Sequence, residues 1–328
     1  RSEDGYEWPL NYKGKQWYFA RNNIGNKASN YFQQENRWSV DGSVSPGPKR
    51  TWENEKFMTS LMGSAYSLKL PKIDRSALRV MIGLRKYICS QFKPNVAKAL
   101  YDLFKAKNIM DFSMGWGDRL AGFFASQNTE LYVGVDPRKE NHPIYREQAD
   151  YYEGQLTMFE TMKKVDFYCE AAEDFYYDGY EDTFDVIFTS PPYFNVERYS
   201  HDDNQSWVRY KDIDGWNTQF LQKALDNMLP TLKSGGKLCI NISDVYANSK
   251  WSSDRCWLKI CDPMNEFLDT YKDMDYVGCI GMEMAKRPNS GGAGTAKDKT
   301  QYSEESLQLA EETKNKRFCE PIWIWEKK

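Results

Sequence analysis

This sequence has few histidines, no closely spaced cysteine pair and no long apolar run. The 328-residue chain has two histidines, His142 and His201, and its seven cysteines include no Cys-x-x-Cys pair. We therefore expect neither a zinc site with the usual ligand spacing nor a His-based catalytic triad, and we predict no metal site. The cysteines are odd in number, widely spread and partly set in apolar runs such as residues 237–241, which is typical of reduced core thiols.

The sequence also has no run of about 18 apolar residues, and residues 1–4 carry no basic-then-apolar export signal. These absences predict a cytoplasmic protein without a membrane span. Hydrophobic residues make up 41% and charged residues 28% of the chain, which places it among globular proteins and excludes a disordered chain.

Charge is unevenly distributed along the chain. The net charge is −3, which argues against a protein that simply coats nucleic acid, yet residues 61–110 hold ten Lys and Arg against Asp74 and Asp102. Such a basic segment on an acidic body either faces phosphate groups or forms an ordinary solvated surface. Both interpretations stay open at this point.

From about residue 74 the sequence alternates between short apolar runs and stretches with helical spacing. Strands are expected at 109–113, 131–136, 165–169, 184–189 and 237–242, with helices at 76–85, 94–104, 119–126, 144–163 and 216–232. This alternation predicts an α/β fold with a mainly parallel, doubly wound sheet. Two late runs, 276–282 and 321–325, are expected to pair antiparallel at the edge of the sheet.

Outside this pattern the chain is less regular. The hydrophobic residues of 1–60 do not recur with a sustained helical or strand period. We therefore expect an irregular N-terminal extension over 1–73 and an α/β domain over 74–328. The Gly- and Ser-rich stretch 288–295 predicts a flexible insertion at about 286–318.

Two strand ends point to a nucleoside cofactor. Asp111 ends the first strand and is followed by Gly115 and Gly117, which let a ligand approach bare backbone at the carboxyl end of the sheet. Asp136 ends the second strand, where a carboxylate can accept both ribose hydroxyls. Leu120 occupies the third glycine position of a dinucleotide motif, and the carboxylates of Asp111 and Asp118 suit the ammonium of a methionine-like group better than a pyrophosphate.

The fourth strand ends in Thr189-Ser-Pro-Pro-Tyr-Phe194, and here the sequence resembles the amino-group DNA methyltransferases of the phage and prokaryotic type. The resemblance covers roughly residues 88–328 and includes the turn Leu232-Lys-Ser-Gly-Gly-Lys-Leu238 before the fifth strand. It implies a class I, Rossmann-like methyltransferase domain that uses S-adenosylmethionine. It further implies cofactor contacts from the following residues: Phe92, Pro94, Asp111, Ser113, Gly115, Gly117, Asp136 and Glu173.

The resemblance also implies how the target base is handled. Ser190 and the Pro191 carbonyl would each accept one hydrogen of the exocyclic amino group, Pro192 would stiffen the loop, and Tyr193 would stack on a base flipped out of the helix. Substrate contacts are further expected from Phe194, Arg198 and Tyr199.

The sequence departs from the family pattern in ways that leave the target base open. Ser190 stands where Asp or Asn is commonest, so adenine N6 and cytosine N4 both remain possible targets, and Phe112 replaces a usual proline. The expected partner is DNA, with RNA as the first alternative. A protein-glutamine methyltransferase and a non-catalytic nucleic-acid-binding module follow in that order, and the oligomeric state is not indicated.

Overall fold

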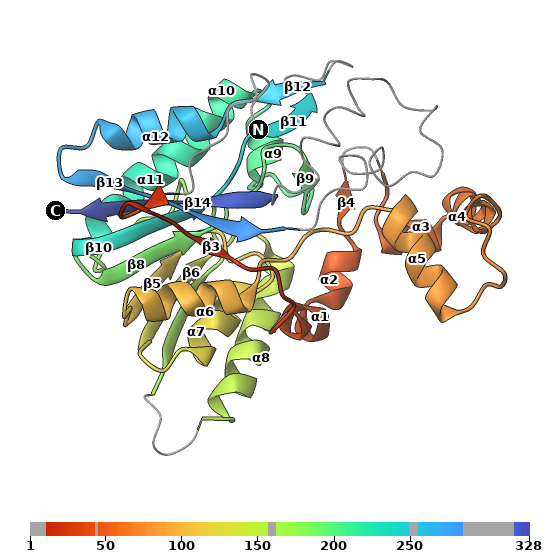
Figure 1. The fold of residues 1–328 in the computed structure, drawn as a ribbon, viewed down its shortest axis with the longest axis horizontal. Helices are drawn as coiled ribbons and strands as arrows, with labels where there is room; N and C mark the ends of the chain where they lie inside the picture. Colours follow the sequence, from red (N-terminus) through yellow and green to blue (C-terminus); the bar gives the residue numbers. More distant parts are fainter. Residues whose placement is uncertain (1–10, 43–44, 157–161, 249–254, 285–317) are drawn as a thin grey trace.

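The computed structural model describes residues 11–42, 45–156, 162–248, 255–284 and 318–328. The insertion expected at 286–318 lies outside the described residues except for Phe318. The centre of the molecule is a ten-stranded sheet in the order β2-β1-β13-β14-β10-β8-β5-β6-β7, with β3 paired beside β13 (Figure 1).

Five parallel strands form the half of this sheet that carries the glycine turn and the acidic strand ends. They are β5 (Asn108–Asp111), β6 (Leu131–Val135), β7 (Lys164–Tyr168), β8 (Phe184–Thr189) and β10 (Leu232–Asn241). The chain winds from β5 outward to β7 and then returns to place β8 on the other side of β5. This reversal opens a crevice at the carboxyl ends of β5 and β8, where doubly wound sheets bind their ligands.

Successive side chains of the central strands enter two different cores, because neighbouring residues in a strand point to opposite faces. Ile109 of β5 and Val186 of β8 pack on one face, whereas Met110 and Ile187 pack on the other. Both faces are therefore apolar, which explains why these strands read as nearly continuous hydrophobic runs.

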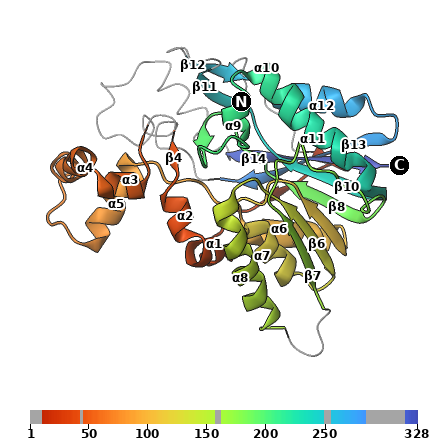
Figure 2. The same cartoon turned by 180° about the vertical axis from the view of Figure 1, so that it is seen from behind.

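Helices cover both faces of the sheet (Figures 1 and 2). One face is covered by α6 (Pro94–Leu103), α7 (Asp118–Ala125) and α8 (His142–Glu153). The other face is covered by a continuous helical stretch and α12 (Cys261–Asp269). The stretch consists of a π-helical turn η2 (Trp216–Gln222), α11 (Lys223–Met228) and η3 (Leu229–Thr231). The helices α6, α7 and α8 and the stretch 216–231 correspond to predicted helical segments, although α8 ends at Glu153 and not at 163, and α12 was not predicted. The predicted α/β doubly wound fold is confirmed.

The late strands β13 (Met274–Glu283) and β14 (Cys319–Lys327) pair antiparallel, as the sequence predicted. They differ from the prediction in position, because β14 lies inside the sheet between β10 and β13. Trp323 and Trp325 of β14 are almost fully buried, and an interior strand can bury such large side chains where an edge strand would expose part of them.

The N-terminal part is more regular than the sequence suggested. Short strands β1 (Asn11–Tyr12), β2 (Lys15–Gln16) and β3 (Tyr18–Phe19) extend the sheet beyond β13. Four helices follow: α1 (Lys27–Phe32), α2 (Gln34–Trp38), α3 (Pro48–Glu53) and α4 (Glu55–Ser67). The next helix, α5 (Arg75–Arg85), was predicted at 76–85. The helices before α4 have five or six residues, too short to form without tertiary contacts or to show a sustained period.

Small elements complete the fold. Strand β4 (Asp41–Gly42) pairs with β9 (Glu197–Arg198), and β11 (Val245–Asn248) pairs with β12 (Arg255–Leu258). Three short helical turns are η1 (Lys139–Asn141), α9 (Ser206–Arg209) and α10 (Ile213–Gly215). Within the described ranges, no helix is both long and apolar enough to cross a lipid bilayer.

Candidate active site

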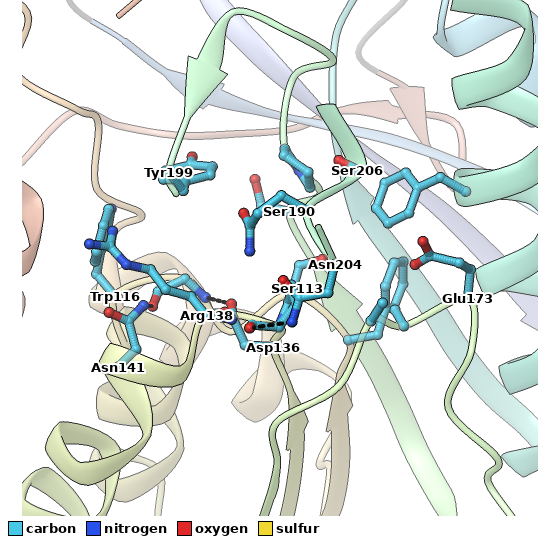
Figure 3. Close-up of a pocket in the computed structure, with 18 residues that line it drawn as sticks. Ser113, Trp116, Asp136, Arg138, Asn141, Glu173, Ser190, Tyr199, Asn204 and Ser206 are labelled. Atoms are coloured by element: carbon cyan, nitrogen blue, oxygen red, sulfur yellow. Dashed lines mark hydrogen bonds between the residues drawn. The ribbon is translucent and has the colours of Figure 1, made fainter. Parts of the chain in front are cut away.

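A pocket lies at the carboxyl ends of β5, β6 and β8, with an empty volume of about 610 Å³ that includes some open solvent (Figure 3). Residues from four segments line it, within 112–116, 136–141, 171–173 and 190–206, together with Phe220. Seven of the predicted site residues belong to this lining: Ser113, Gly115, Asp136, Glu173, Ser190, Pro192 and Tyr199.

The loop between β5 and α7 forms the floor of the pocket. Gly115 has a φ of +58° and would place a Cβ in nearly open space, 3.9 Å from the Ser113 carbonyl oxygen. Gly117 has a φ of +74° and caps α7, and a Cβ there would lie 2.3 Å from Oε1 of Gln148. Both positions favour glycine because L side chains rarely adopt this backbone region. Gly115 leaves the bare loop accessible to a ligand, whereas Gly117 allows the loop to pack closely on α8.

Asp136 joins this loop to the end of β6. Its Oδ2 accepts a hydrogen bond from the Gly115 amide at 2.9 Å, and its Oδ1 accepts one from the Arg138 amide at 2.9 Å. Each carboxylate oxygen can accept a second hydrogen bond, so both remain able to receive a ligand hydroxyl. Burial raises the pKa of Asp136, and the two amides act in the opposite direction.

Glu173 lies on the opposite side of the pocket and is 1% exposed. Its Oε1 accepts hydrogen bonds from Nη1 of Arg209 at 2.9 Å and from the Tyr210 hydroxyl at 3.0 Å. Its Oε2 is buried and has no hydrogen-bond partner among the described residues. A buried oxygen without a partner is costly, so a donor group of a bound ligand would stabilise it.

Ser190 follows β8 directly and faces the same pocket. Its hydroxyl donates to Oδ1 of Asn241 at 3.3 Å, and Nδ2 of Asn241 donates to the Pro321 carbonyl at 2.9 Å. Asn241 ends β10 and Pro321 lies in β14, so two neighbouring strands orient the Ser190 side chain.

Eight predicted site residues lie outside the pocket lining. Asp111 is fully buried and bound by Arg119 and by the Tyr132 hydroxyl at 2.7 Å. We expected its carboxylate to receive the cofactor's ammonium, but the structure uses it to anchor the loop. Gly117 shapes that loop. Pro94 begins α6, and the ring of Phe92 lies against Phe188 and the Arg119 guanidinium beneath the loop.

The remaining four follow Ser190 in the chain. Pro191 is buried, and Tyr193 is half-buried against the core on the α12 side of the sheet. Phe194 was expected to contact substrate, but it is fully buried against Trp216 and has a φ of +47°. The Arg198 guanidinium lies over the ring of Trp207. Phe194 is therefore a core residue, because the chain turns back into the protein directly after the two prolines.

Several lining residues were not found by sequence reasoning. Trp116 donates to the Ser90 carbonyl and packs edge-to-face on Tyr199, while Arg138 lies over its ring at 5.2 Å. Asn204 reaches the Pro137 carbonyl at 3.0 Å and so holds the segment after β9 across the pocket. Trp116 stands inside the recognised glycine motif, but nothing in the sequence reveals the contacts made by Asn204.

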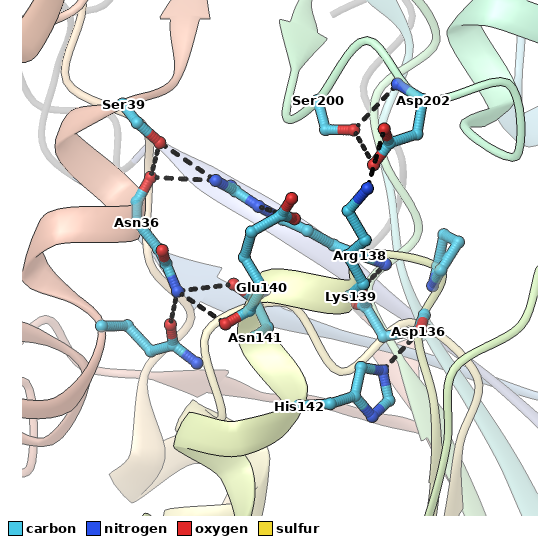
Figure 4. A network of polar contacts seen from close by, with 12 residues as sticks. Asn36, Ser39, Asp136, Arg138, Lys139, Glu140, Asn141, His142, Ser200 and Asp202 are labelled. Carbon is cyan, nitrogen blue, oxygen red and sulfur yellow. Dashed lines mark hydrogen bonds and ion pairs between the residues drawn. The ribbon is translucent and has the colours of Figure 1, made fainter.

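The N-terminal extension supports the pocket from outside (Figure 4). Nη2 of Arg138 donates to the Asn36 carbonyl at 3.3 Å and to the Ser39 hydroxyl at 3.0 Å. Nδ2 of Asn36 donates to Oδ1 of Asn141, whose own amide donates to the Gly115 carbonyl. This chain of contacts connects α2 to the glycine loop, although the two are about eighty residues apart in the sequence.

The observed donors and acceptors fit S-adenosylmethionine. The Asp136 carboxylate suits a ribose, the partnerless Glu173 Oε2 suits a donor such as an adenine amino group, and open space at Gly115 admits the ligand close to the backbone. Among the described residues, no group of three or more His, Cys, Asp or Glu side chains could hold a metal ion.

Part of the chain matches a known protein family. Residues 184–327 match the model of a family described as DNA methylase, N6_N4_Mtase, in a span that begins at β8 and includes the Ser190 loop. No curated protein sequence matches the chain.

Several solved methyltransferase structures are similar to this chain. TrmN from Thermus thermophilus has 13% identity and a TM-score of 0.37, over 72% of this chain and 49% of its own, so the match spans about half of that protein. An S-adenosylmethionine-dependent O-methyltransferase from Thermotoga maritima has 11% identity and a TM-score of 0.39, over 76% and 69% of the two chains. The N-methyltransferase NodS from Bradyrhizobium japonicum has 9% identity and a TM-score of 0.38, over 71% and 95%.

The family match agrees with the resemblance first suggested by the Ser190–Tyr193 loop. The chain has a doubly wound α/β fold, and its residues 184–327 are similar to the N6/N4 DNA methylase family.

Proposed function

We propose that this chain methylates the exocyclic amino group of a DNA base, adenine N6 or cytosine N4, as an enzyme of the phage or prokaryotic type. The observation that carries the proposal is the position of Ser190. It begins the Ser-Pro-Pro-Tyr loop at the end of β8, and it lines the same pocket as Asp136 and Glu173.

The cofactor end of the pocket is assigned to four residues. Asp136 would hold the ribose hydroxyls, and Glu173 would accept a hydrogen bond from the adenine. Ser113 and Gly115 would contact the cofactor from the glycine loop. When bound there, S-adenosylmethionine supplies an electrophilic methyl group. Asp111 and Arg119 would act indirectly, by holding the loop in shape.

The base end of the pocket is assigned to the loop after β8. A ring amino group is a poor nucleophile because its lone pair is delocalised into the ring. Ser190 and the Pro191 carbonyl would each accept one amino hydrogen, which orients the nitrogen and favours its tetrahedral form. A base in a duplex must leave the helix to reach this loop, at a cost of a few kcal/mol.

Tyr193 has a narrower role in this proposal than the family resemblance implies. It is half-buried against the core and outside the pocket lining, so stacking on a flipped base would require its ring to turn toward Ser190. Tyr199 already lines the pocket in contact with Trp116 and is the aromatic residue better placed to contact a base.

Transfer of a labelled methyl group tests the proposal. Unmethylated DNA and, separately, RNA would be incubated with the protein and methyl-deuterated S-adenosylmethionine, and the nucleosides analysed by mass spectrometry. Deuterated N6-methyladenine or N4-methylcytosine from DNA is the expected result and identifies the base. Label found in RNA alone would make this an RNA enzyme. If neither nucleic acid were labelled while the cofactor still bound, a protein-glutamine substrate or a non-catalytic role would replace the proposal.

A variant pair connects that reaction to the loop. Ser190→Ala removes one of two proposed acceptors and should lower the transfer rate about 10²- to 10³-fold while leaving cofactor affinity unchanged. Thr270→Ala removes an exposed hydroxyl at the end of α12 and should behave as wild type. An unchanged rate in Ser190→Ala would remove Ser190 from the proposed mechanism.

A further inference from the structure

The helices α3, α4 and α5 form a lobe that projects from one side of the molecule, away from the sheet (Figures 1 and 2). We call residues 48–86 the basic lobe. It contains nine Lys and Arg against Glu53, Glu55 and Asp74, a net charge of +6 in a chain whose total is −3. A small unit so different in charge from the rest of its chain is suited to an anionic partner.

The basic lobe has its own small core. Leu61 and Ala65 of α4 pack with Met81 of α5 in a cluster separate from the two cores of the sheet. The side chains of α4 and α5 that point inward are thus already partnered within the lobe. The opposite face of α5 is left to solvent.

That outer face combines basic and apolar side chains. Arg75, Arg79, Val80 and Leu84 recur at helical spacing and are all exposed. Neither Arg75 nor Arg79 forms an ion pair with any residue that the structure describes. Two arginines one turn apart repel each other, so a partner that carries negative charge would relieve an unfavourable arrangement.

The end of α5 leads directly to the active-site pocket. Tyr87 follows the helix, and its hydroxyl donates to Oε1 of Glu197 at 3.2 Å, in the segment that continues from the Ser190 loop. Its ring packs in one cluster with Trp116 and Tyr199, and both of these line the pocket. The residue that directly follows the basic lobe is therefore in contact with residues that line the pocket.

We infer that the basic lobe binds the sugar–phosphate backbone of duplex DNA beside the target base, with Arg75 and Arg79 of α5 as phosphate contacts. This inference rests on the proposed function, because the pocket next to the lobe is the one that would receive the base. Val80 and Leu84 follow the two arginines along the exposed side of α5 and would pack against neighbouring sugars. Backbone contacts of this kind set the position of a duplex and carry no sequence information themselves.

Binding of a fluorescent DNA duplex, measured by anisotropy across a salt series, tests the inference. The double variant Arg75→Ala/Arg79→Ala should bind about 10- to 60-fold more weakly at 0.1 M salt, and the slope of log affinity against log salt should fall by about two. Arg75→Lys/Arg79→Lys keeps both charges and should bind close to wild type, since phosphate contacts need charge more than shape. Cofactor affinity should be unchanged in both.

The control is Lys15→Ala/Lys272→Ala, which removes the same net charge from two exposed lysines outside the lobe. It should bind DNA as wild type does. If both alanine pairs weakened binding equally, or if Arg75→Ala/Arg79→Ala bound normally, the inference would be wrong. Tighter binding of wild type to an RNA duplex than to the DNA duplex would also overturn it.

Methyl transfer distinguishes failure of the inference from failure of the proposed function. If wild type methylates DNA and the arginine variant has an unchanged KM for DNA, only the role of the lobe fails. If wild type methylates no DNA at all, the proposed function fails and the inference fails with it.

Discussion

Arg119 holds the carboxylate of Asp111 through two hydrogen bonds, from Nε to Oδ2 at 2.7 Å and from Nη2 to Oδ1 at 3.2 Å. Both side chains are almost fully buried, and the Tyr132 hydroxyl donates to the same carboxylate. Arg119 belongs to α7 and Asp111 to β5, so this pair fastens the two ends of the glycine loop to each other. The proximity of Asp111 raises the pKa of Arg119 despite its burial.

Breaking this pair should destabilise the protein strongly. Arg119→Met leaves a buried carboxylate without its counter-charge and should lower the free energy of unfolding by about 3–5 kcal/mol. Asp111→Asn/Arg119→Met removes both charges and should cost less than the sum of the two single variants. Urea unfolding of the three variants measures the coupling, and strict additivity would show that the pair does not act as a unit.

Asp136 should control cofactor affinity. Asp136→Asn keeps the shape of the side chain but replaces its charged acceptor with a neutral one. A hydrogen bond to a charged group contributes about 1.5–3 kcal/mol, so S-adenosylmethionine should bind the variant about 10- to 100-fold more weakly. Calorimetry of the variant against Asp150→Asn, an exposed change on α8, provides the measurement and its control.

The same residue predicts a pH dependence of cofactor binding. Burial raises the pKa of Asp136, so protonation sets in at a higher pH than for an ordinary aspartate. Because the ionised form is the better acceptor, affinity should fall as pH falls through that raised pKa. Asp136→Asn should show a flatter profile, and parallel profiles would assign the dependence to another group.

Asn241 should act on catalysis through Ser190. Asn241→Ala removes the acceptor that orients the Ser190 hydroxyl and should lower kcat about tenfold or more with little change in KM for DNA. Asn128→Ala, an exposed amide in the loop before β6, is the matched control. An increase in KM alone would indicate a role in binding instead of positioning.

Asp118 should make stability depend on pH. Burial raises its pKa to about 7, opposed by the Ser29 hydroxyl and by the charges of Arg37 and Arg119. The folded state therefore holds a proton that the unfolded state releases near pH 4. The free energy of unfolding is therefore highest below the unfolded-state pKa of Asp118. It falls as pH rises from there toward 7, by up to about 1.4 kcal/mol per pH unit.

Asp118→Asn mimics the protonated form and provides the test. The variant should be more stable than wild type at pH 8, and the difference should shrink as the pH approaches 5. Asp273→Asn, at an exposed position before β13, should show no such trend. A constant difference between Asp118→Asn and wild type across this range would contradict the assignment.

Local sequence signals were sufficient to predict the parallel half of the sheet and part of the candidate active site. Strand and helix periods are local properties, so β5 to β10 and their crossover helices could be predicted from residue order alone. Asp136 and Ser190 were identified because each directly follows a strand, and Gly115 because it stands in the glycine turn after β5. The carboxyl ends of parallel strands meet at one edge of a sheet, which brings the three residues together.

Other features depended on contacts between distant segments. Asp111 was predicted to bind a ligand, but its carboxylate pairs with Arg119 and holds the loop. Phe194 is buried because the chain re-enters the core beside Trp216. The helices α1 and α2 are too short to be stable alone and form against α7 and the Asp136 loop. Sequence order thus determined which residues end the strands, whereas tertiary packing decided which of their side chains remain accessible to a ligand, because burial and pairing depend on segments that approach one another only in the folded chain.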